Sequence, residues 1–424
     1  MLQTRLIFVL RLVVLWLTLL GHAPRLNASS YTLSHFYSAA LLHDPNLSSS
    51  LAGVDQAKAQ RSQLKALAMP SLDLLYSYQR IDPVTNIFGQ NLSPALQQNS
   101  RFQLRQPVFQ GGAEYAAFHR GETLEEVATL RTFSAKRTLY LEVAKAFFEA
   151  ILANNLRLNS ERALSAIELR VKENHKRYKQ GRLSESSYLS SQAQYSLEQS
   201  QVYASKARQE TAQLELTRLT GSQISDLSLL VIPEIREPPK QDKILDKLAR
   251  HPEIATLQKQ QESEDQFETQ TKGSFLPRVD LLGNYYLLRQ GPLASSQWDA
   301  SLQASWSIFN GGLNRAQILE STAKQKDLEI QLQGALTRLK TQADSLQQFL
   351  IKQRVVIEQI KVSLKHAENA FNASKKESKK GSSDELEALL LLTNYISTKD
   401  KLEQSFYDYQ ISWSQFDALT GETL

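Results

Sequence analysis

The residues most often used for catalysis and metal binding occur in this chain without the spacing that those chemistries need. The chain has seven histidines and no cysteine, which excludes disulfides, thiol nucleophiles and cysteine-ligated metals. No two histidines have metal-ligand spacing on a helix, and neither a Gly-x-Ser-x-Gly elbow nor a phosphate-cradling loop occurs. Basic and acidic residues are mixed along the predicted helices, which disfavours DNA binding. We therefore expect no enzyme, no metal and no cofactor.

Two of the histidines, His43 and His251, lie close to prolines that recur along the chain. Pro45 and Pro252 are 207 residues apart. A further proline follows each of these after 25 residues: Pro70 and Pro277. Because proline stops a helix at the residue before it, the pattern predicts repeated helix ends. We interpret the two histidines as parts of those ends rather than as ligands.

An internal repeat explains this recurrence. MPSLDLLYSY (69–78) matches LPRVDLLGNY (276–285) at an offset of 207 residues. Beyond a predicted surface loop in the first copy, Ile81–Pro94, the offset is 200. The matches at this offset are Phe109-Gln110-Gly111-Gly112 with Phe309-Asn310-Gly311-Gly312, Gly181 with Gly381, Leu189 with Leu389, Tyr195 with Tyr395, and Leu219-Thr220-Gly221 with Leu419-Thr420-Gly421. We predict repeat 1 over 29–238 and repeat 2 over 239–424.

Each copy has the same predicted order of elements. A helical stretch, 31–67 or 241–271, precedes two strands, and a long helical hairpin follows them. The strands are expected at about 70–80 and 99–109 in the first copy and at about 277–289 and 298–309 in the second. The hairpins are expected at about 112–220 and 312–421. A Gly-Gly pair at the exit of each second strand permits a sharp change of direction.

The last predicted strand is the clearest, because polar and apolar residues alternate from Trp298 to Ile308 without a break. A period of two gives a strand two unlike faces. In a soluble protein the apolar face would pack on a core. In a membrane sheet it would contact lipid, with aromatic residues near the interfaces. On that interpretation the lipid-facing residues are Trp298, Leu302, Ala304 and Trp306.

The long helices carry a coiled-coil pattern. A seam with steps of four and three residues is apolar at all but one of its positions: Leu332, Leu336, Leu339, Ala343, Leu346, Leu350, Gln353, Ile357, Ile360, Leu364, Ala367 and Phe371. The first copy has a looser seam: Leu139, Val143, Ala146, Ala150, Ala153, Leu164, Ile167 and Val171. Each long helical segment would extend for roughly 100 Å. Seams this narrow need partner helices.

The N-terminus has the layout of a secretory signal peptide, which we predict over residues 1–28. An N-terminal membrane anchor is the alternative. Without this segment the formal net charge falls from +5 to +2, because it contains Arg5, Arg11 and Arg25. The basic character of the whole chain is therefore weak evidence for nucleic-acid binding. No later stretch is apolar over about 18 residues, so no transmembrane helix is expected.

Four strands cannot close a membrane barrel, which needs at least about eight. A sheet edge left open in lipid costs several kcal/mol for each unpaired backbone group. The strands of several chains are therefore pooled, or they do not lie in a membrane. The unpartnered seams lead to the same expectation, an oligomer of long hairpins.

This ordered, duplicated set of features resembles the TolC-type outer-membrane efflux proteins of Gram-negative bacteria. The resemblance covers essentially the whole mature chain. It implies a mainly α-helical homotrimer with a 12-stranded β-barrel in the outer membrane, four strands from each chain, and a helical tunnel that extends into the periplasm. It also implies a passive exit duct for efflux or secretion. The implied partners are a periplasmic adaptor (membrane fusion protein) and an inner-membrane pump or ABC-type secretion transporter.

The resemblance also assigns roles to residues. The turns remote from the barrel would contact the adaptor: Arg177, Tyr178, Gly181, Leu183, Lys379 and Gly381. The glycine pairs would join barrel and tunnel: Gly111, Gly112, Gly311 and Gly312. Where relatives have Val-Gly-Leu, this chain has Gln180-Gly181-Arg182. Where relatives lock the tunnel with Tyr, Arg and Asp, it has Ser378, Ser383 and Glu387, so that form of the lock is absent.

Three acids, Asp384, Glu385 and Glu387, would then lie at the tunnel end. One hypothesis is that they form a constriction that favours cations, as rings of carboxylates do. The alternative is that they stabilise a helix N-terminus. The lysines before this turn would contact an acidic partner or simply be solvated: Lys375, Lys376, Lys379 and Lys380. The competing function for the whole chain is a periplasmic coiled-coil scaffold or adhesin stalk with no pore.

Overall fold

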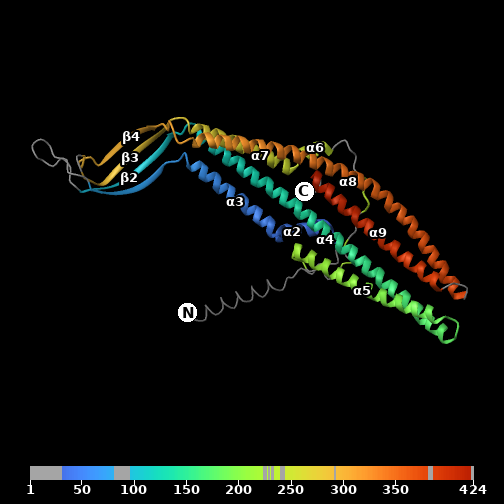
Figure 1. Cartoon of the computed structure of the whole chain (residues 1–424). Helices are drawn as coiled ribbons and strands as arrows, with labels where there is room; N and C mark the ends of the chain where they lie inside the picture. The colour runs from blue at the N-terminus through green and yellow to red at the C-terminus, as the bar shows by residue number, and fades with distance from the viewer. Residues whose placement is uncertain are drawn as a thin grey trace, which may run out of the picture. The chain divides into compact units, whose positions relative to one another are not determined.

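Long helices and one four-stranded sheet make up the part of the chain that the structure describes. A computed structural model describes residues 31–80, 96–222, 227, 230, 234–238, 244–290, 293–380 and 385–421. The elements in chain order (Figure 1) are α2 (Leu33–His43), α3 (Pro45–Ala66), β1 (Ser71–Arg80), β2 (Leu96–Phe109), α4 (Ala113–Lys179), α5 (Glu185–Thr220), α6 (Ile244–Ala249), α7 (Pro252–Gly273), β3 (Arg278–Arg289), β4 (Trp298–Ser305), α8 (Leu313–Lys380) and α9 (Glu385–Thr420). The predicted signal peptide and the predicted loop Ile81–Pro94 lie outside the described residues.

None of the described helices combines the length and the apolar character needed to cross a bilayer.

The helical stretch predicted over 31–67 consists of two helices, α2 and α3, with a helix end at His43. They separate at Asp44, whose Oδ1 accepts a hydrogen bond from the Leu47 N–H at 2.6 Å. Pro45 occupies the first turn of α3, where its missing N–H has no helical partner to lose. The second copy breaks in the same way between α6 and α7, where His251 Nδ1 accepts from the Glu253 N–H at 3.2 Å. His251 is therefore a helix cap, and Asp44 holds the corresponding place in the first copy.

The corresponding helices of the two halves have almost the same lengths. α3 and α7 have 22 residues each, α5 and α9 have 36 each, and α4 and α8 have 67 and 68. α5 and α9 both end at a Leu-Thr-Gly sequence, where Gly221 and Gly421 have φ of 67° and 76°. Because L-residues rarely adopt such φ values, glycine sets both helix ends.

Burial of the long helices confirms the predicted seams. On α4 the seam positions Leu139, Val143 and Ala150 are buried. On α8, Leu339, Leu350 and Ile357 are buried at the predicted spacing, and Leu336, 42% exposed, is the one seam position classed as exposed. Steps of four and three residues therefore do keep one stripe of each helix against its neighbours.

The chain forms two compact units, and α4, α8 and α9 each contribute residues to both. The first unit comprises the described residues within 31–43, 143–237 and 355–411. Within it, Phe36 of α2 packs on Phe147 of α4, with ring centroids 5.6 Å apart. Asn155 Nδ2 of α4 donates to Glu403 Oε2 of α9 at 2.8 Å. Phe371 of α8 stacks on α9 through Tyr395.

The second unit comprises the described residues within 44–142, 238–354 and 412–421, and β1, β2, β3 and β4 belong to it. α3 contacts α4 through Ser50 and Thr132, whose hydroxyls lie 3.0 Å apart. α7 contacts α8 through Ser321 Oγ, which donates to the Glu264 carbonyl oxygen at 3.1 Å. Small hydroxyl residues at these contacts let the helices of this unit approach closely.

Candidate functional site

The sheet has the antiparallel order β1-β2-β3-β4, and its register aligns apolar residues across all four strands. One row consists of Leu74, Phe102, Tyr285 and Trp298. The neighbouring row consists of Leu72, Leu104, Gly283 and Ala300. Because partners in register share a face, these rows form one continuous apolar surface.

This apolar surface is exposed in the single chain. The exposed fractions are 60% for Leu74, 63% for Tyr76, 70% for Trp298 and 68% for Leu302. A sheet that formed half of a soluble core would bury its apolar face. The soluble-core interpretation of the last strand therefore does not describe this chain as it stands alone.

The other face of the sheet is polar and connected by hydrogen bonds. Gln103, Asn284 and Asp299 lie in register on three strands. Gln103 Nε2 donates to Asn284 Oδ1 at 3.0 Å, and Asn284 Nδ2 donates to Asp299 Oδ1 at 2.7 Å. Arg105 and Asp280 form an ion pair at 2.8 Å on the same sheet. The sequence indicated the polarity of this face, but the hydrogen-bonded pairs depend on register.

The last strand is shorter than predicted and ends at Ser305 instead of residue 309. Ser305 pairs with Arg278, the first residue of β3, so no partner residue remains for the segment that follows. Alternation of polar and apolar residues alone therefore overestimated the length of this strand. Trp306 lies just outside β4, and its indole Nε1 donates to the Phe275 carbonyl oxygen at 2.9 Å. That bond ties the segment after β4 to the segment after α7.

Glycine pairs form both passages from strand to long helix, as the sequence predicts. The φ values of Gly111, Gly112, Gly311 and Gly312 lie between 70° and 85°. At Gly111 a second constraint exists, because a Cβ there would lie 2.1 Å from the carbonyl oxygen of Gly273 at the end of α7. The first passage is therefore packed against α7, whereas a Cβ on Gly311 or Gly312 would meet open space.

The turn between α4 and α5 is a Schellman motif. The Arg182 N–H donates to the Arg177 carbonyl at 2.9 Å, and the Gly181 N–H donates to the Tyr178 carbonyl at 2.9 Å. Gly181 has φ of 67°, which is the left-handed conformation that this motif requires. Leu183 is half-buried just beyond the turn.

Aromatic stacking supports this turn from the helices on either side. The rings of Tyr178 on α4 and Tyr188 on α5 stack in parallel, with centroids 5.2 Å apart. His175 lies 5.3 Å from the ring of Tyr188. Arg177, a predicted contact residue, pairs with Glu173 of its own helix at 3.1 Å. The sequence did not single out Tyr188, although its spacing across the predicted turn was a usable signal.

The turn between α8 and α9 lies mostly outside the described residues. Gly381 and Asp384 belong to the part left out, and the side chains of Lys379 and Glu385 are not described. Glu387, in the first turns of α9, is exposed. The proposed acidic constriction therefore stays a prediction.

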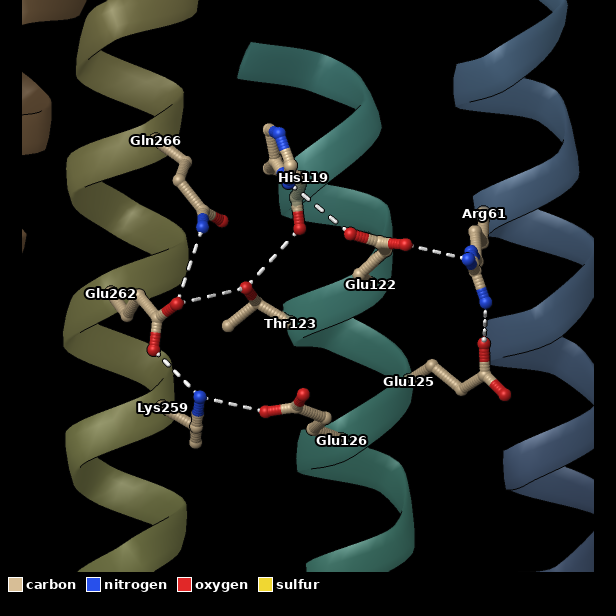
Figure 2. A network of polar contacts seen from close by, with 9 residues as sticks. All are labelled: Arg61, His119, Glu122, Thr123, Glu125, Glu126, Lys259, Glu262 and Gln266. Atoms are coloured by element: carbon tan, nitrogen blue, oxygen red, sulfur yellow. Dashed lines mark hydrogen bonds and ion pairs between the residues drawn. The ribbon is translucent and has the colours of Figure 1, made fainter. Parts of the chain in front are cut away.

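A polar network links three helices of the second unit and was not predicted. Figure 2 shows Arg61 of α3 between Glu122 and Glu125 of α4, at 2.6 and 3.1 Å. Lys259 of α7 bridges Glu126 and Glu262 at 2.7 and 2.8 Å. These side chains line a groove of about 840 Å³. Mixed charges along a helix do not reveal which helices they join, so the sequence carried no signal for it.

Comparison with known proteins accounts for this combination of sheet, glycine passages and helical hairpins. The model of the outer membrane efflux protein family matches residues 36–222 and again residues 244–422. The chain belongs to the outer membrane efflux protein family. The predicted TolC-type resemblance is thereby confirmed. As a member of this family the chain is a transport protein of the Gram-negative outer membrane that extends into the periplasm. Members of the family are channels rather than enzymes.

Individual relatives are distant in sequence and similar in fold. The alkaline protease secretion protein AprF of Pseudomonas aeruginosa is 21% identical over 423 residues, covering 94% of this chain and 86% of AprF. A membrane protein of Pseudomonas aeruginosa has a TM-score of 0.80 at 14% identity, covering 92% of each chain. The outer membrane channel CmeC of Campylobacter jejuni has a TM-score of 0.78 at 15% identity, covering 92% of this chain and 85% of CmeC.

Proposed function

We propose that this protein is the passive exit duct of a tripartite efflux or type I secretion system. It would be a homotrimer in which the four-stranded sheets of three chains join into one 12-stranded barrel, and the helical hairpins form a tunnel in the periplasm. Each chain would carry two tandem copies of the same unit. The double match of the family model and the equal lengths of corresponding helices support this repeat.

The observation that carries the proposal is the sheet with two unlike faces. Its apolar rows are exposed in the single chain, and its polar face is connected by side-chain hydrogen bonds. Lipid would cover the first face, including Trp298, Leu302, Ala304 and Trp306. Water in the pore would solvate the second. Joining three sheets edge to edge would also satisfy the free edges of β1 and β4, which lipid cannot solvate.

The helix turns would contact the partner proteins. A periplasmic adaptor would bind the turns after α4 and α8, and an inner-membrane pump or ABC-type transporter would supply the energy. AprF, a relative over nearly the whole chain, is a protease secretion protein, which supports the inclusion of secretion beside efflux. The glycine passages would connect the barrel with the tunnel.

Assembly and conductance test the proposal. The detergent-extracted outer membrane should contain a heat-modifiable trimer, and the purified trimer should conduct ions in planar bilayers. Co-purification after crosslinking should retrieve an adaptor together with its transporter. A product that stays soluble in the periplasm and never conducts would instead support the scaffold or adhesin alternative.

A further inference from the structure

The second unit contains another groove besides that of Figure 2, and this one is lined mainly by basic side chains. It has a volume of about 1000 Å³ and is lined by α4, α7, α8 and the last turns of α9. Its charged side chains are Arg131, Arg137, Arg338 and Glu253, and His251 lies among them. Arg338 and Glu253 form an ion pair with each other. The charges that remain unpaired in the groove are therefore those of Arg131 and Arg137.

Those two arginines have no partner among the described residues. Arg131 is exposed at the groove. Arg137 Nη1 is buried and forms no hydrogen bond, although burial without a partner is costly for a guanidinium. Burial also lowers the pKa of Arg137. An arginine nevertheless keeps its charge in proteins, so the half-buried Arg137 brings a cation with an unused donor to the groove.

The guanidinium of Arg137 packs against the end of α9. A Cβ on Gly421 would lie 2.9 Å from Arg137 Nη2, so the missing side chain of Gly421 leaves room for the guanidinium. Arg137 lines the groove, and its unpaired Nη1 is buried, so the guanidinium would turn toward the groove to meet a ligand. Guanidinium groups recognise carboxylate and phosphate oxygens through paired donors.

His251 adds a donor that responds to pH. Its Nδ1 accepts the Glu253 N–H, so in the neutral ring the proton is on Nε2. Burial first, and then the charges of Arg137 and Arg338, lower the pKa of His251 to about 4. The ring is therefore neutral at physiological pH. An anion beside it would favour the charged form and raise that pKa.

The basic groove contrasts with the groove of Figure 2, which uses other residues of α4. That groove contains four glutamates against Arg61 and Lys259: Glu122, Glu125, Glu126 and Glu262. Because α4 and α7 also line an acidic groove elsewhere, the excess of arginine is a local property. A volume of this size suits a small organic ligand.

We propose that the groove between α4, α7 and α8 binds a small polyvalent oxyanion, with carboxylate or phosphate oxygens on Arg137 and Arg131 and on Nε2 of His251. The site does not depend on pore formation. Binding would join α4, α7, α8 and the end of α9 within one unit.

Calorimetric titration of the full-length protein in detergent tests the site, with citrate as the probe and acetate at equal ionic strength as the monovalent reference. Arg137→Gln should weaken citrate binding about tenfold, as expected for the loss of a charge-assisted hydrogen bond. Arg131→Gln, which changes an exposed side chain and leaves packing intact, should weaken it several-fold. Arg315→Gln, on α8 but outside the groove, should leave it unchanged.

The pH arm uses sulfate, whose charge is constant in this range. Sulfate should bind more tightly as the pH falls from about 7 toward about 5, because anion binding and protonation of His251 favour each other. His251→Asn retains a side chain that caps helices and should abolish this dependence. Equal affinities of wild type and both groove variants for citrate, or no preference for citrate over acetate, would overturn the proposal.

Discussion

Single glycines decide how strands pass into helices in this protein. Gly111 and Gly312 both have positive φ, but only Gly111 also faces a backbone atom, the Gly273 carbonyl oxygen. The left-handed conformation alone costs an L-residue roughly 1–2 kcal/mol. Substitutions at these two glycines therefore separate the free-energy cost of the backbone conformation from the cost of a steric clash.

We predict that Gly111→Ala destabilises the protein more than Gly312→Ala. The second change should cost about 1 kcal/mol of unfolding free energy, because its Cβ meets open space. The first should cost several times as much, because the end of α7 has to move. Thermal unfolding of the extracted protein compares them. Equal losses would mean that the contact between this passage and α7 contributes nothing.

At the scale of elements, the last strand is the sharpest test of what covers the sheet. Leu302 and Gln303 are neighbours on β4 and both are exposed in the single chain. Leu302 pairs with Leu281 on the apolar face, whereas Gln303 pairs with Asp280 on the polar face. The same new charge at the two positions therefore meets different surroundings.

Leu302→Lys should reduce assembly in the outer membrane, because a lysine facing lipid costs about 2–4 kcal/mol near the bilayer midplane. Ala304→Lys should act in the same way. Gln303→Lys is the matched control and should be tolerated. The amount of heat-modifiable trimer in outer-membrane extracts measures the effect. Equal tolerance at Leu302 and Gln303 would show that this strand is not in a bilayer.

Carboxylates between the helices of the first unit predict a pH dependence. Glu198 of α5 and Asp400 of α9 line one groove of about 440 Å³. Burial, and then the charge of Asp400, raise the pKa of Glu198. Burial raises the pKa of Asp400, although the hydrogen bond from Asn159 acts in the opposite direction. Stability from raised pKa values is present at low pH and is lost as the pH rises through them.

Asp400→Asn should therefore raise the thermal stability of the protein at about pH 8 and leave it unchanged at about pH 4. Asparagine retains an acceptor for the hydrogen bond from Asn159. Asp344→Asn removes an exposed carboxylate from α8 and controls for net charge. A lower melting temperature for Asp400→Asn at high pH would show that the hydrogen bond outweighs burial.

The elements themselves were largely predictable from the sequence. Proline and glycine fix helix ends through the backbone of a single residue, so local patterns located Pro252, Gly181 and Gly421. Strand length was less predictable, because β4 ends where its partner β3 begins, and the alternation within β4 does not show where that is. The basic groove had no signal at all, since Arg137, His251 and Arg338 come together only when three helices pack.

At the scale of the whole molecule, the family, its location and the mainly helical fold followed from an ordered set of weak motifs. No single Gly-Gly or Leu-Thr-Gly is specific, but their repetition at one offset is. The second helix turn is different, because in the proposed trimer its role would depend on how the copies meet. A single sequence contains no distances between chains, so the acids of that turn stay a prediction.

Substitution of these acids tests whether they give the proposed duct its ion selectivity. If Asp384, Glu385 and Glu387 meet around a threefold axis, their charges would concentrate cations at the narrow end. Glu387→Gln combined with Asp384→Asn should then shift the reversal potential in a salt gradient toward that of a non-selective pore. Glu185→Gln removes the first-turn acid of α5 and controls for stabilisation of a helix N-terminus. If planar-bilayer recordings give the same selectivity for the wild type, the double variant and the Glu185→Gln control, these acids only stabilise the start of α9.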